Sequence, residues 1–176
     1  MAFAVARTRD EAFLYLELQP CPDCGSVEAP WQHALIEVDG ELVISYAAVC
    51  PGCDAEREYL FGLPARETAP DSWPAFGGTE PSELLDAGQW MAVADQAAGN
   101  VPVEPGEARV ALSIARAAVG EVIKFVPAGL DGVPADAFWT PEGRRVFDAE
   151  PGRFRLDRLL VVQDTYSELV RETGAN

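Results

Sequence analysis

The sequence predicts an α+β protein, with a small three-stranded antiparallel sheet near the N-terminus and a mainly helical C-terminal part. Three observations predict this class. Two Cys-Pro-x-Cys turns flank two apolar runs joined by Asp39-Gly40, a third such run follows the second turn, and the remaining chain has helical apolar spacing. We therefore expect a first module over 1–62, a Pro/Gly-rich linker or strap over 63–80, and a helical part over 81–176.

A short helix is expected first, from about residue 9 to a point near Pro20. Thr8 precedes this run and Glu11 lies three residues later, which is the pattern of a capping box. The apolar residues expected to face a core are Phe13, Leu14 and Leu18.

Three strands are expected after this helix. Residues 31–38 and 41–49 flank Asp39-Gly40, and Asp-Gly between two apolar runs indicates a two-residue hairpin. Residues 56–62 can add a third strand to this hairpin.

The two Cys-Pro-x-Cys turns hold every cysteine of the chain. Each is followed by a residue that tolerates left-handed geometry, Gly25 or Asp54, so that backbone N–H groups can point at the sulfurs and two thiolates can reach a metal at about 2.3 Å. In a reducing compartment, such pairs favour metal binding over structural disulfides. A thioredoxin-like dithiol would need a strand-to-helix junction, and neither turn has that setting.

The order of turn, hairpin, turn and strand resembles a zinc ribbon, over residues 20–62 only. The resemblance implies that one tetrahedral zinc ion is held by Cys21, Cys24, Cys50 and Cys53. Four thiolates leave no position for water, so this zinc would be structural. The alternatives are iron in a rubredoxin-like site, a ribbon that no longer loads metal, and cysteines that are simply buried.

The negative net charge of the chain disfavours some classes of binding partner. The net charge of -16, from 29 acidic and 13 basic residues, opposes binding to nucleic acid and to anionic membranes. Residues 1–80 hold 4 basic and 14 acidic side chains (net -10), and residues 81–176 hold 9 and 15 (net -6). No signal-peptide core and no membrane-length apolar run is evident, so we expect a cytoplasmic protein.

Sequence motifs identify no catalytic residue. His33 invites comparison with zinc deaminases, but Leu35 stands where their catalytic Glu would be and Val49 stands before Cys50 in place of Pro. His33 is therefore expected to be a partly exposed strand residue. No nucleophile elbow, P-loop, dinucleotide fingerprint or H-E-x-x-H motif is present.

Several helices are expected in the C-terminal part. The first runs from about residue 81 to 98, and a long central helix covers about 107–126. Thr140-Pro141 starts a short helix, and a final helix over about 153–172 has adjacent apolar residues that suggest burial on more than one side.

One basic cluster stands out in this part: Arg144, Arg145, Arg153, Arg155 and Arg158. It could form an edge for an acidic partner, or it could pair with Asp148, Glu150 and Asp157 within the fold.

The favoured function is therefore non-catalytic protein binding, with zinc as a staple and an acidic ribbon surface that recognises a basic protein. Small acidic immunity proteins, which neutralise basic toxins, are similar to this chain in size and charge, and the comparison rests on those two properties alone. The alternatives are an enzyme with an unrecognised site in the helical part, and a nucleic-acid or transcription-associated ribbon.

Overall fold

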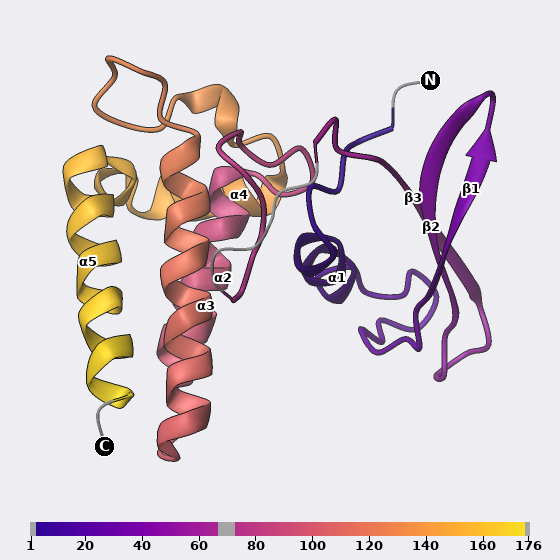
Figure 1. Ribbon diagram of the computed structural model, residues 1–176, viewed down its shortest axis with the longest axis horizontal. Coiled ribbons are helices and arrows are strands. Elements are labelled where there is room, and N and C mark those ends of the chain that lie inside the picture. Colours follow the sequence, from indigo (N-terminus) through magenta and orange to yellow (C-terminus); the bar gives the residue numbers. More distant parts are fainter. Residues whose placement is uncertain (1–2, 67–72, 175–176) are drawn as a thin grey trace. The chain divides into compact units, whose positions relative to one another are not determined.

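The chain folds as two units, Met1–Ala69 and Pro70–Asn176 (Figure 1). The computed structural model describes residues 3–66 and 73–174. A three-stranded antiparallel sheet lies in the first unit and the longer helices lie in the second, which confirms the predicted α+β class. The expected linker over 63–80 spans the division between the units, and its residues 67–72 lie outside the described ranges.

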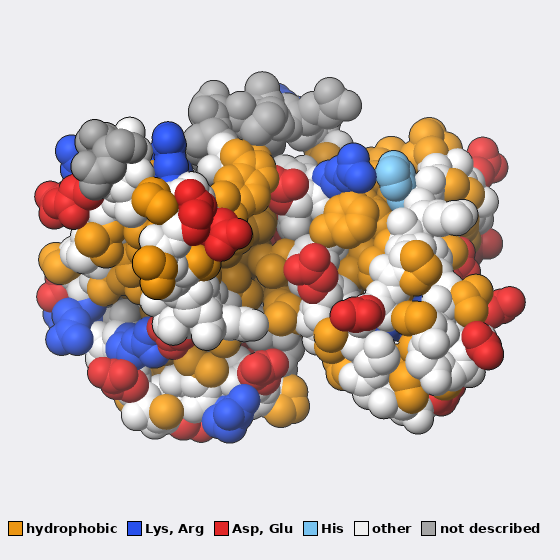
Figure 2. All heavy atoms as spheres, turned by 90° about the horizontal axis from the view of Figure 1, so that it is seen from below, with side chains coloured by type: hydrophobic (Ala, Val, Ile, Leu, Met, Phe, Trp, Pro, Cys, Tyr) orange, Lys and Arg blue, Asp and Glu red, His pale blue; other side chains and the backbone are white. Residues whose placement is uncertain are grey.

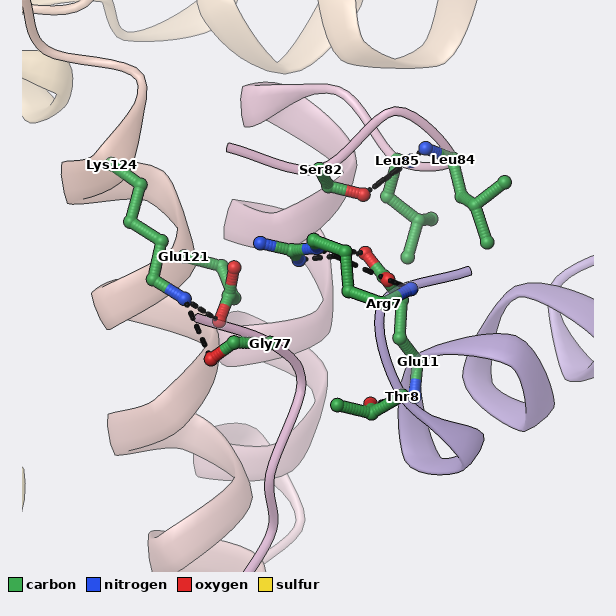
Figure 3. A network of polar contacts seen from close by, with 9 residues as sticks. All are labelled: Arg7, Thr8, Glu11, Gly77, Ser82, Leu84, Leu85, Glu121 and Lys124. Atoms are coloured by element: carbon green, nitrogen blue, oxygen red, sulfur yellow. Dashed lines mark hydrogen bonds and ion pairs between the residues drawn. The ribbon is translucent and has the colours of Figure 1, made fainter. Parts of the chain in front are cut away.

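The first unit begins with helix α1, Arg9–Glu17, where its capping sequence predicts it. Thr8 Oγ1 accepts a hydrogen bond from the Glu11 N–H at 3.1 Å. The Glu11 carboxylate accepts from the backbone N–H of Arg7 at 2.7 Å and also from its guanidinium, which fixes the start of the helix (Figure 3).

The buried stripe of α1 differs from the expected one. Ala12 and Leu16 are fully buried, because residues four apart lie on one side of a helix and this side is innermost. The residues expected there, which are only half-buried, are Phe13, Leu14 and Leu18.

The sheet has the order β1-β2-β3, with β1 at Gln32–Val38, β2 at Glu41–Val49 and β3 at Glu56–Gly62. All three strands lie where the sequence predicts them. At the hairpin, Asp39 has φ 53° and Gly40 has φ 84°, both in the left-handed region that a two-residue turn of this kind requires.

Helix α1 covers one face of the sheet. Residues directly opposite on antiparallel strands share a face, and Tyr46 lies opposite Tyr59. Phe13 meets Tyr46 edge-on with ring centroids 5.5 Å apart, and Tyr15 meets Phe61 in the same way at 5.6 Å. This aromatic layer is the centre of the first unit.

The opposite face is exposed at the end that lies next to the cysteines. Gln32, Ala47 and Glu58 lie side by side across the three strands, and Val49 lies opposite Glu56 in the next row. All five residues are exposed.

Helix α2 of the second unit, Ala87–Gly99, begins later than expected. Asp86 and Gln89 form a capping box, in which Asp86 Oδ1 accepts from the Gln89 N–H at 2.8 Å and Gln89 Oε1 accepts from the Asp86 N–H at 3.0 Å. Upstream, Ser82 Oγ accepts from the N–H groups of Leu84 and Leu85 (Figure 3). This local hydrogen bonding holds a turn where the prediction placed helix.

Helix α3, Pro105–Lys124, packs against α2 and against the final helix α5, Leu156–Thr173, which confirms its predicted central place. Near its end, Lys124 Nζ contacts the Glu121 carboxylate and lies 3.4 Å from the Gly77 carbonyl oxygen (Figure 3). Lys124 thereby ties the segment at Gly77 to α3.

Two aromatic residues of that segment behave differently. Phe76 is buried, and its ring centroid lies 4.9 Å from that of Trp90. Trp73 is more than half exposed. Of these two aromatic residues, Phe76 is therefore the one that packs into the core of the second unit.

Helix α4, Pro141–Ala149, starts at Thr140 as predicted, and Pro151–Phe154 then form a short 3₁₀-helix. Because this turn uses residues assigned to the last helix, α5 begins at Leu156. The expectation that α5 is buried on more than one side is wrong. Only Leu159 is fully buried, because α3 covers one side of α5, and the exposed apolar residues are Leu160, Val161, Val162 and Leu169.

A buried carboxylate joins the starts of α2 and α4. Asp86 is fully buried, and its Oδ2 accepts from the Thr140 N–H at 2.8 Å and from the Thr140 hydroxyl at 2.7 Å. The two helices are so close that a Cβ at Gly143 would lie 2.0 Å from Asp86 Oδ1, and one at Gly88 would lie 2.3 Å from the Gly143 carbonyl oxygen.

Within the described residues, none of the helices combines the length and the apolar character that crossing a membrane would require.

Candidate metal centre

The four cysteine sulfurs converge on one point of the first unit. The sulfur atoms of Cys21 and Cys53 lie 3.6 Å apart, as do those of Cys24 and Cys50, and all four lie within 4.8 Å of one another. A tetrahedron with metal–sulfur bonds of about 2.3 Å has sulfur–sulfur edges of about 3.8 Å. Residues that are far apart in the sequence thus form a set of four donors that could hold one metal ion.

The two turns that carry the cysteines have matching backbones. The Gly25 N–H donates to the Cys21 carbonyl at 2.8 Å, and the Asp54 N–H donates to the Cys50 carbonyl at 2.9 Å. Gly25 and Asp54 have φ of 76° and 59°, which is the left-handed geometry predicted for these positions. Each turn therefore presents its two sulfurs in the same way.

Backbone N–H groups point at the sulfurs, as the Cys-Pro-x-Cys pattern predicts. Those of Asp23 and Cys24 donate to Cys21 and lower the pKa of its thiol to about 7. At Cys53, the Ala55 N–H lowers the pKa, but contact with the Cys24 thiol, desolvation and the remaining sulfurs outweigh it and raise the pKa to about 12. Four adjacent sulfurs repel each other once ionised, and a bound cation removes that repulsion.

The second turn has a glycine, Gly52, where the first has Asp23. A Cβ at Gly52 would lie 3.2 Å from the Cys24 sulfur and 3.9 Å from the Cys50 sulfur. The absence of a side chain here lets the two turns approach each other. Cys21 and Cys50 are buried, whereas Cys24 and Cys53 are exposed, so the donor set lies at the edge of the unit.

Arg57 braces the first turn, and sequence reasoning missed this role. Its Nη2 donates to the Gln19 carbonyl at 2.5 Å, two residues before Cys21. The guanidinium lies over Trp31, 4.8 Å from the ring centroid, and 5.9 Å from the Tyr59 centroid. Its Nε and Nη1 are buried and have no hydrogen-bond partners among the described residues. The neighbours of these two nitrogens are therefore the aromatic rings. The one available signal was that Arg57 is the single basic residue of an acidic segment.

His33 is an exposed residue of β1, as expected, and its ring lies beside Tyr46 with centroids 5.7 Å apart. It does not belong to the cysteine cluster.

The predicted basic cluster is largely paired within the second unit. Arg153 forms a bidentate pair with Asp95, an ion pair that the sequence did not indicate, and also lies 3.8 Å from Glu150. Arg155 pairs with Asp157 at 3.2 Å. Arg145 lies 3.7 Å from Glu142, while Arg144 and Arg158 form no ion pair with a described residue. A partner-binding role for this cluster stays a prediction.

Comparisons with known proteins identify no relative, so the site is interpreted from its geometry alone. No family model matches the chain, and neither a curated protein nor a solved structure matches it.

Proposed function

We propose that the first unit is a zinc ribbon, in which Cys21, Cys24, Cys50 and Cys53 hold one structural zinc ion. The convergence of the four sulfurs supports this proposal, because thiolates at tetrahedral spacing suit Zn²⁺. Four protein ligands complete the tetrahedron and leave no position for a reacting water, so the ion staples the two turns together. Iron suits the same donors and is distinguished by metal analysis.

The proposed role of the whole protein is non-catalytic binding of a basic protein partner. Between residues 20 and 62, all of which the structure describes, eight side chains are acidic and one is basic. All eight carboxylates are exposed, none forms an ion pair with a described residue, and the one basic side chain, Arg57, is buried. Acidic side chains are spread over the right-hand part of Figure 2, where the first unit lies.

This surface is the observation that carries the proposal. Exposed carboxylates without internal cations attract a cationic partner, raise its association rate and select against acidic ones. A basic toxin held by an immunity-like inhibitor would be one partner of this kind, and nucleic acid is opposed by the same charge.

Native mass spectrometry of the protein, purified gently from the cells that make it, tests both parts. We expect one zinc ion per chain and a stoichiometric basic protein that dissociates as salt is raised. A chain that carries no metal contradicts the ribbon. Nucleic acid bound at moderate salt contradicts the proposed partner class.

A further inference from the structure

A groove of about 640 Å³ lies at the cysteine end of the exposed sheet face, entirely within the first unit. Its lining consists of Pro30, Gln32, Ala47, Ala48, Val49, Glu56, Arg57 and Glu58. Because side chains alternate along a strand, those of Ala47, Val49, Glu56 and Glu58 lie on one face of the sheet, with Arg57 directed to the other. The groove therefore combines a small apolar floor with two carboxylates.

The carboxylates are placed for a cation. Glu58 Oε1 accepts a hydrogen bond from the Ser45 hydroxyl at 2.7 Å, which holds this side chain in position along the sheet. Glu56 lies two residues away on the same face, and neither carboxylate has an ion-pair partner among the described residues. Val49, which lies opposite Glu56 and directly before Cys50, is half exposed, so a long aliphatic side chain finds apolar contact there.

We infer that this groove binds an extended basic segment of a protein, with the stem of a lysine or arginine on Ala47 and Val49 and its charged head at Glu56 and Glu58. The inference rests on the proposed function and names the place where the basic partner docks. Lysine and arginine carry both parts of this chemistry, an apolar stem and a cationic end. A second copy of this unit would bring carboxylates against carboxylates, so self-association does not fit the same surface.

Fluorescence anisotropy of a labelled peptide of alternating lysine and threonine, titrated with the full zinc-loaded chain, tests the inference. The control peptide has acetyl-lysine at every lysine, which keeps the stem and removes the charge. The double variant Glu56→Gln/Glu58→Gln is compared with Glu37→Gln/Glu41→Gln, which removes the same charge from exposed positions at the hairpin end of the sheet. A second pair, Ala47→Phe and Ala34→Phe, adds the same bulk to exposed positions inside and outside the groove.

We expect the lysine peptide to bind, and the Glu56→Gln/Glu58→Gln variant to bind it about tenfold more weakly, while the hairpin-end variant changes the affinity by less than about twofold. Ala47→Phe should weaken binding and Ala34→Phe should not. An equal loss of affinity in both charge variants would overturn the assignment of binding to the groove. The acidic surface as a whole would then be the binding feature. No binding by the wild-type chain, or equal binding of the acetylated peptide, would overturn the proposed function and the groove with it.

Discussion

At the scale of single residues, Arg57 shows how one side chain supports the cysteine cluster. It is buried, it caps the Gln19 carbonyl beside Cys21, and it lies over Trp31. A hydrogen bond from a charged donor contributes about 1.5–3 kcal/mol, and stacking on an aromatic ring adds to it. The desolvation of the guanidinium opposes this gain, because two of its nitrogens have no hydrogen-bond partner among the described residues.

Replacing Arg57 by alanine should lower the free energy of unfolding of the first unit by about 2–3 kcal/mol, since the Gln19 carbonyl loses its donor and Trp31 loses its neighbour. Arg57→Lys keeps a charged donor without the planar stacking surface, so its loss should be smaller. Urea unfolding of the zinc-loaded chain, followed by Trp fluorescence, measures both. A loss below about 0.5 kcal/mol for Arg57→Ala would show that the brace contributes little.

A second residue links stability to pH. The Glu104 carboxylate at the start of α3 accepts from the Glu107 N–H at 2.7 Å, and this bond, with one from Gly106, lowers the pKa of Glu104. A lowered pKa in the folded state stabilises the fold at pH values above the ordinary pKa of Glu, and this contribution is lost as the pH falls through the lowered value.

The stability difference between the wild-type chain and Glu104→Gln should therefore be present at neutral pH and vanish in acid. Chemical denaturation of both chains across that pH range measures it. A difference that is constant with pH would mean that the carboxylate charge does not contribute at this helix start.

At the scale of elements, the contact between α2 and α4 depends on two glycines. Gly88 and Gly143 let the helix starts approach closely enough for Asp86, which already caps α2 through Gln89, to hydrogen-bond with Thr140 as well. One carboxylate thus caps α2 and reaches the N-cap residue of α4. Helix N-termini favour such a negative charge.

Gly143→Ala should destabilise the second unit by about 3 kcal/mol or more, because the added methyl group would overlap the Asp86 carboxylate and force the helices apart. The matched control is Gly99→Ala at the end of α2, where an added Cβ meets nothing within 4 Å. That change should be neutral or stabilising by up to about 1 kcal/mol. Thermal unfolding compares the two, and similar midpoints would contradict the close contact of the helices.

At the scale of the whole molecule, the two units rely on different sources of stability. The second has a core of helices packed around α3, whereas the first has a small sheet, one helix and the cysteine cluster. Structural zinc contributes about 10 kcal/mol or more to small zinc modules, which is comparable to the whole stability of a domain. If the cysteine cluster holds the proposed zinc ion, the stability of the first unit should therefore depend on that ion.

Removing the metal with a strong chelator, or substituting Cys50→Ser, should unfold the first unit, so that its amide NMR signals lose their chemical-shift dispersion. The amide signals of α3 and α5 should stay in place. Val27→Ser is a control in the same region, because its side chain is exposed and supplies no thiolate. Unchanged signals from β1 to β3 after chelation would show that metal does not staple the sheet.

Short-range patterns in the sequence were sufficient to predict the helix, the strands and the turns of the N-terminal half. The Asp39-Gly40 turn, the three strands, the Thr8 cap and the two cysteine turns were all predicted, since each depends on a few neighbouring residues and on backbone geometry that only certain residues tolerate. The set of four candidate metal ligands followed from the resemblance of these turns and their hairpin to a zinc ribbon.

Other features were decided only by the tertiary structure. The exposure of α5 and the buried positions of Arg57 and Asp86 depend on contacts between residues far apart in the sequence. Apolar spacing shows that a helix has a face to bury, but it does not show which neighbour covers that face or how much. The sequence by itself therefore determined the local elements and the candidate metal ligands, and the packing of those elements decided the brace on Arg57, the helix junction at Asp86 and the groove.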